Sequence, residues 1–113
     1  MGSRKQHGDA CAALEGLTSA DTSQRVPSLH RLVAALDSAY GAESVAICAA
    51  VREVPGVLAA LVKFLEADPD DTGSTADACS VIANICSDEV DPQSAVTKRQ
   101  LLAHPGAAES IFW

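Results

Sequence analysis

Aromatic residues are scarce in this sequence: they make up 4% of its 113 residues, although apolar residues as a whole make up 48%. The apolar residues are therefore mostly Ala, Val and Leu, whose small side chains fill a core only when the backbones that carry them pack closely. Ala and Leu also favour helices. The composition predicts an all-α protein, and the chain length suits one domain.

Long apolar runs are absent as well. None approaches the ~20 residues needed to cross a bilayer, and the N-terminal residues MGSRKQHGDA lack the apolar segment of a secretory signal. We therefore expect no membrane partner and an intracellular location. Cytoplasm and nucleus are both consistent with the sequence.

Basic residues are few. Lys and Arg number 8 against 15 Asp and Glu, which gives a net charge of −7. Proteins that bind nucleic acids neutralise phosphates with clustered Lys and Arg, so this balance argues against a nucleic-acid partner. No basic residue lies between Lys63 and Lys98, and the acids of this stretch fall mostly at turns. They predict an acidic rim that would attract a basic partner.

Motifs for metal or cofactor binding are missing. The sequence contains no C-x-x-C pair and no glycine-rich phosphate loop. The run DPDDTG at residues 68–73 imitates the start of a calcium-binding loop, but Cys79 stands where a bidentate Glu is required. We expect neither a metal nor a cofactor. The four cysteines lie in apolar helical segments and are predicted to be reduced, buried packing residues: Cys11, Cys48, Cys79 and Cys86.

Apolar side chains recur with helical spacing through most of the chain. The stripes predict helices over residues 9–18, 27–40, 42–53, 57–67, 74–86 and 92–103. Pro55 forces a break after the third helix, and Asp91-Pro92 is expected to cap the last one. Residues 1–8 are polar and are expected to form a flexible tail, which leaves a single helical domain over residues 9–113.

Two internal alignments indicate a repeat. Pro55-Gly56 and Pro105-Gly106 are 50 residues apart, and each follows a helical segment. DACAALEGLTS at residues 9–19 aligns with DACSVIANICS at residues 77–87, at an offset of 68. The two offsets differ, which is compatible with helical repeats, because the loops of successive repeats vary in length while their helices stack in the same way. We therefore expect the helices around Leu14 and Ile82 to lie side by side, and both Pro-Gly pairs to form equivalent corners.

Residues 42–87 resemble one unit of the armadillo repeat family and, more loosely, of the related HEAT repeats. Gly56-Val57, Leu61-Val62 and Phe64-Leu65 resemble the second helix of an armadillo unit. Ala78, Ile82, Asn84 and Ile85 resemble its third helix. Residues 9–40 and 92–113 match in part. The resemblance implies a right-handed α–α superhelix of about two to two and a half repeats, the last of them incomplete.

The same resemblance implies a site. In peptide-binding armadillo proteins the third helices line a concave groove, where an Asn near the end of each helix binds the ligand backbone. Asn84 occupies this position, whereas Gly16 occupies it in the preceding unit, and Ser80 stands where binders of nuclear-import signals have Trp. We therefore predict a non-catalytic module that binds a protein or an extended peptide. Its partner-binding residues are predicted to be Asn84, Ser80, Asp77, Asp70 and Asp71.

Other functions remain open at this point. The chain also has features of an N-terminal or truncated piece of a longer solenoid, with a structural role or with self-association through Ile111, Phe112 and Trp113. A plain helical bundle would show much of the same periodicity. A small helical enzyme would require a cleft in which His104 meets Cys79 or Cys86.

Overall fold

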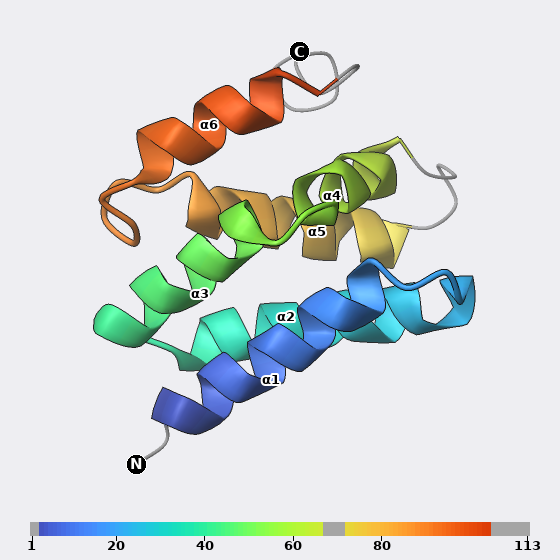
Figure 1. Ribbon diagram of the computed structural model, residues 1–113, viewed down its shortest axis with the longest axis horizontal. Helices are drawn as coiled ribbons and strands as arrows, with labels where there is room; N and C mark the ends of the chain where they lie inside the picture. Colours follow the sequence, from blue (N-terminus) through green and yellow to red (C-terminus); the bar gives the residue numbers. More distant parts are fainter. Residues whose placement is uncertain (1–2, 67–71, 105–113) are drawn as a thin grey trace.

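The computed structural model describes residues 3–66 and 72–104, which form six α-helices, one 3-10 turn and no strand (Figure 1). The prediction of an all-α fold is confirmed. The elements in chain order are α1 (Ser3–Leu17), η1 (Thr22–Gln24), α2 (Arg25–Ser38), α3 (Ala42–Glu53), α4 (Val57–Leu65), α5 (Thr72–Ile85) and α6 (Ser94–Leu102).

The helices are arranged as two antiparallel pairs, with α3 between them and α6 at one side (Figure 1). The first pair is α1 with α2, and the second is α4 with α5. The two pairs meet chiefly where α2 packs against α5, and these two helices run in the same direction. Helix α3 contacts both pairs, and α6 packs on α4.

One continuous apolar core runs through all six helices. Each helix contributes a stripe of side chains at helical spacing, as the sequence predicts, and the stripes meet in the interior. The largest fully buried side chains include Leu14, Leu17, Leu29, Leu32, Ile47, Leu61, Ile85 and Leu101.

A sharp corner separates α3 from α4. Pro55 ends the helical run, and Gly56 adopts a φ of 89°, a left-handed conformation that side chains disfavour. The axes of α3 and α4 are consequently bent by 87°. The predicted break at Val54-Pro55 is confirmed, whereas Pro105-Gly106 lies outside the described residues.

Among the described helices, none is long and apolar enough to cross a membrane. Helices α3 and α4 taken together have sufficient length and hydrophobicity, but the 87° bend separates them.

Close packing of α1 on α2 depends on Gly16. A methyl group at this position would lie 1.8 Å from Ser28 Oγ and 2.8 Å from Ser28 Cβ, well inside van der Waals contact. Gly16 and Ser28 are both buried. The absence of a side chain at Gly16 therefore permits the approach of the two helices.

Several predicted helix starts are wrong, and α5, for example, begins at Thr72 rather than at Ser74. Helix α1 begins at Ser3 rather than at Asp9, because residues 3–8 carry no apolar stripe from which periodicity would detect the helix. Helix α6 begins at Ser94 rather than at Pro92. Asp91 accepts a hydrogen bond from the Gln93 backbone N–H at 3.0 Å, so it shapes the turn before the helix.

The expected pairing of α1 with α5 is also wrong. The helix that lies against α5 is α2, whereas α1 packs on α2, α3 and α4. The segments around Leu14 and Ile82 are therefore not neighbouring members of one layer. The alignment of residues 9–19 with residues 77–87 reflects a shared small-residue composition, which suits any closely packed helix.

The prediction that all four cysteines are buried is wrong for two of them. Cys11 and Cys79 are exposed, Cys86 is half-buried and Cys48 is fully buried. The four cysteines form no disulfide with one another, in line with the prediction. Cys11 and Cys79 lie within apolar segments but on the outer sides of their helices. Successive side chains of a helix point in different directions around its axis, so some residues of an apolar segment face outward.

Candidate functional site

The predicted site residues on α5 lie along one side of the helix. Asp77, Ser80 and Asn84 are all half-buried, and their spacing of three and four places them one above another. Asn84 Nδ2 donates a hydrogen bond to the Ser80 carbonyl oxygen at 2.9 Å. The amide oxygen of Asn84 remains available to a ligand. The other two predicted residues, Asp70 and Asp71, lie outside the described part of the chain.

Asp77 is joined to α2. His30 Nδ1 lies 3.3 Å from Asp77 Oδ2, with the imidazole 79% exposed and the carboxylate 26% exposed. His30 was not predicted from the sequence, because it lies 47 positions before Asp77. This contact shows the level at which α2 and α5 lie side by side.

Further polar residues follow along the two helices. Because α2 and α5 are parallel, Asp37 and Asn84 each lie seven residues beyond the contact between His30 and Asp77, a rise of about 10 Å along each helix. Asp37 is exposed. Asp37 and Asn84 therefore come at corresponding levels of the two helices, about two turns beyond His30 and Asp77. We call the face that contains these residues the α2–α5 surface: His30, Asp37, Asp77, Ser80 and Asn84.

One end of the α2–α5 surface is hollowed. A cavity of about 520 Å³ lies between the first turns of α2 and α5, and its walls include Val26, His30, Ser74 and Asp77. Val26 is 48% exposed. The surface thus offers a polar line along α5 and an apolar hollow at its beginning, a combination suited to a polypeptide ligand.

Gly16 does not belong to this surface. The resemblance assigns Gly16 to the position of the ligand-binding Asn in the preceding unit, but the residue is buried against Ser28 of α2. Its helix, α1, packs on α2 and α3 rather than on α5. The residue of α2 at the level of Asn84 is Asp37, which the sequence alignment did not indicate.

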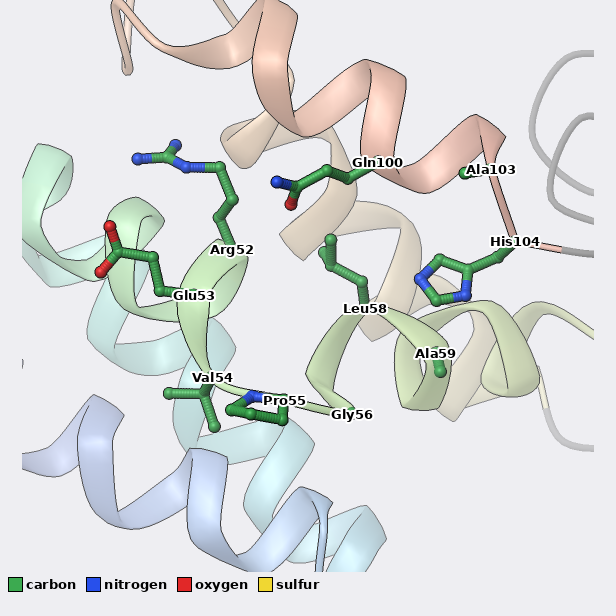
Figure 2. Close-up of a pocket in the computed structure, with 10 residues that line it drawn as sticks. All are labelled: Arg52, Glu53, Val54, Pro55, Gly56, Leu58, Ala59, Gln100, Ala103 and His104. Carbon is green, nitrogen blue, oxygen red and sulfur yellow. The ribbon is translucent and has the colours of Figure 1, made fainter.

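A second hollow lies between the α3–α4 corner and α6, and we call it the corner pocket (Figure 2). Its volume is about 290 Å³. One wall consists of residues 52–56 with Leu58 and Ala59, and the other of Gln100, Ala103 and His104. Figure 2 shows the His104 ring leaning over the start of α4, toward Leu58 and Ala59, while Gln100 extends from α6 into the space between Arg52 and Leu58.

A buried polar network joins α3 to the segment before α6, next to this pocket. Arg52 Nη1 donates to Asp91 Oδ2 at 3.0 Å and to Thr97 Oγ1 at 3.3 Å. Asp91 and Thr97 are fully buried. With the hydrogen bond from the Gln93 N–H, both carboxylate oxygens of Asp91 have a partner, as a buried charge requires.

The thiols near this network are poor nucleophiles. Burial raises the pKa of Cys48 to about 11, and the charge of Asp91 adds to the increase. Burial also raises the pKa of Cys86. Both thiols are protonated at neutral pH, whereas nucleophilic attack requires the thiolate. The pocket that contains His104 is lined by neither Cys79 nor Cys86, so the juxtaposition required for a Cys-His enzyme does not occur there.

The described residues hold no group of three or more His, Cys, Asp or Glu side chains placed to bind a metal ion.

Comparisons of the chain with protein-family models, with curated proteins and with solved structures found no match. Function is therefore inferred from the geometry of the α2–α5 surface.

Proposed function

We propose that this protein is a non-catalytic interaction module that binds an extended, basic polypeptide segment along the α2–α5 surface. The contact between His30 and Asp77 carries this proposal, because it brings α2 next to the side of α5 that presents Asp77, Ser80 and Asn84. Asp77 and Asp37 supply negative charge on this surface. The Asn84 amide supplies a hydrogen-bonding group for a ligand backbone.

We further propose that the helices form a short armadillo-like or HEAT-like superhelix, with α2 rather than α1 as the third helix of the first layer. The burial patterns of α2 and α5 support this assignment. Leu29, Leu32 and Leu36 are buried in α2, and the residues 49 positions later, Ala78, Val81 and Ile85, are buried in α5. This offset is close to the 50 positions between the Pro-Gly pairs, as expected for successive units of one repeat.

The charge of the chain favours a basic ligand. The net charge is −7, so long-range attraction accelerates encounter with a cationic segment. Helix α5 contains no Lys or Arg, and the basic residue at the hollow is Arg31 of α2, beside His30. Local attraction by Asp37 and Asp77 then orients the ligand on the surface.

A binding experiment with a defined probe tests the proposal. The probe is a fluorescein-labelled, unstructured peptide in which Lys alternates with Ser and Gly, and its control replaces every Lys by Glu. We expect fluorescence anisotropy to detect the Lys peptide only. Asp37→Asn, Asp77→Asn and Asn84→Ala should each weaken binding by about two- to fivefold, the range of an exposed ionic contact.

Asp9→Asn is the matched control, because Asp9 is an exposed acid on α1 and the substitution removes the same charge. Its affinity for the Lys peptide should equal that of the wild type. Equal weakening by Asp9→Asn and Asp37→Asn would show that only net charge matters, and would contradict a site on the α2–α5 surface. Absence of binding by the wild-type protein at low ionic strength would contradict the basic-ligand proposal itself.

A further inference from the structure

We infer that protonation of His30 controls the binding of a basic segment to the α2–α5 surface. The surface binds the segment while the imidazole is neutral, and binds it more weakly once the imidazole is charged. This inference rests on the function proposed above and adds the regulation of that same site. It follows from the position of His30 beside one of the two carboxylates that make the surface negative.

The contact of His30 with Asp77 joins a titratable base to an acid of the binding surface. His30 Nδ1 of α2 lies 3.3 Å from Asp77 Oδ2 of α5. A neutral imidazole with its proton on Nδ1 donates one hydrogen bond here and leaves the charge of the carboxylate in place. A protonated imidazole forms an ion pair at the same position. The charge of Asp77 is then compensated, so it attracts a Lys of the ligand less strongly.

The exposure of the pair permits both forms of the imidazole. The His30 side chain is 79% exposed, so water solvates its charge and protonation requires no change of fold. Imidazole is the side chain that ordinarily changes its charge between pH 5 and 8. Carboxylates and lysines ordinarily keep their charges in this range. The imidazole is therefore the group through which the surface responds to pH.

The other charged groups near His30 form a constant background. The described residues that line the hollow all belong to α2 and α5, and the charged ones besides His30 are Arg31 and Asp77. Arg31 is exposed and forms no ion pair with a described residue, and a guanidinium stays protonated at any pH used here. Helix α1 and η1 also pack on α2, but neither contributes a described residue to the hollow.

The change of charge is large for a surface of this size. Asp37 and Asp77 give the α2–α5 surface two negative charges, and protonation of His30 cancels one of them. Loss of one exposed ionic contact corresponds to a weakening of about two- to fivefold. By linkage, a bound basic segment lowers the pH at which the imidazole is half-protonated, by the logarithm of this factor, or about 0.3–0.7 pH units.

Fluorescence anisotropy of the full chain with the Lys-containing peptide described above tests the inference. The label is rhodamine, because fluorescein itself titrates in this range. Affinity is measured at constant ionic strength between about pH 8 and about pH 5.5, the range in which imidazole changes its charge. We expect the wild type to bind the peptide about two- to fivefold more weakly at the acidic end.

Two variants of His30 fix its charge. His30→Asn keeps a hydrogen-bond donor beside Asp77 but does not titrate, so its affinity should not change with pH. His30→Lys carries a permanent charge and should bind under alkaline conditions as weakly as the wild type binds under acidic ones. Ala95→Lys is the matched control for the added charge, because Ala95 is exposed on α6. His104→Gln removes an imidazole outside the surface. Both controls should keep the pH response of the wild type.

NMR spectroscopy supplies a second readout, because it follows the imidazole itself. Saturation with the Lys peptide should lower the midpoint of the His30 titration by about 0.3–0.7 pH units. An unchanged midpoint, or equal pH responses of His30→Asn and the wild type, would overturn the inference and leave the proposed function intact. Equal weakening by His30→Lys and Ala95→Lys would also overturn it. Absence of binding by the wild type over the whole range would contradict both.

Discussion

The guanidinium of Arg52 in α3 donates a 3.0 Å hydrogen bond to the carboxylate of Asp91, which is fully buried in the turn before α6. The two residues are 39 positions apart, and Thr97 of α6 completes the arrangement. The pair ties the turn before α6 to the end of α3, next to the corner pocket.

Removal of one partner from this pair should be strongly destabilising. Asp91→Asn leaves the charge of Arg52 without a counter-ion, and Arg52→Met leaves the buried carboxylate of Asp91 unpaired. For each variant we expect a loss of about 3–5 kcal/mol in the free energy of unfolding. The measurement is urea unfolding followed by circular dichroism. In the double variant Arg52→Met/Asp91→Leu the loss should be smaller than the sum of the single losses, and simple additivity would show that the two groups are not coupled.

Gly16→Ala should destabilise the contact of α1 with α2. The new methyl group overlaps Ser28, and overpacking of this kind costs about 1–3 kcal/mol. Gly8→Ala is the control, because Gly8 also lies in α1 but a methyl group there would meet nothing within 4 Å. At Gly8 the substitution should stabilise the protein by up to about 1 kcal/mol through helix propensity.

A second variant separates steric overlap from other effects at Gly16. Ser28→Gly removes both atoms that approach Gly16, so it should recover part of the stability lost in Gly16→Ala. Thermal or urea unfolding of the two single variants and the double variant measures the coupling. Equal losses in Gly16→Ala with and without Ser28→Gly would contradict the close approach of the helices.

Gly56→Ala should strain the α3–α4 corner. A left-handed conformation costs a non-glycine residue about 1–2 kcal/mol, and Gly56 has a φ of 89°. Gly73→Ala, within α5 and without close neighbours, should instead be neutral or stabilising. Urea unfolding of both variants checks the difference, and a Gly56→Ala protein as stable as the wild type would show that the corner does not require glycine.

Cys48 should make stability fall at alkaline pH. Its pKa is raised from a usual value of about 9 to about 11 in the folded protein, so the folded state binds this proton more tightly than the unfolded state. The contribution to stability is complete below pH 9 and disappears as pH rises toward 11. Urea unfolding under reducing conditions across this range should show a shallower decline for Cys48→Ala than for the wild type.

Local sequence signals accounted for the elements that are bounded by strong breaks. Helix α3 was predicted over residues 42–53 and occurs there, because Gly41 and Pro55 stop it at both ends. The start of α1 was missed because residues 3–8 have no apolar stripe. The exposure of Cys79 was missed because apolar neighbours in sequence do not define which side of a helix faces out.

Of the candidate site, the sequence indicated Asp77, Ser80 and Asn84 on one side of a helix, but it paired that helix with the wrong neighbour. His30 and Asp37 were not identified, since nothing in a local pattern reports which helix packs against which. At the corner pocket, the sequence indicated only the break between α3 and α4, through Pro55-Gly56. Its opposite wall, at Gln100 and His104, is brought there by packing alone.

Amino-acid order alone established that the chain is helical, where most of its helices lie and that its surface is acidic, because helix periodicity, proline breaks and net charge are local or additive properties. Packing of distant segments determined that α2 rather than α1 lies on α5, that His30 meets Asp77, and that Arg52 pairs with the buried Asp91. These contacts depend on how apolar stripes from separate helices fit together, and many arrangements of the same stripes compete until side-chain shape selects one.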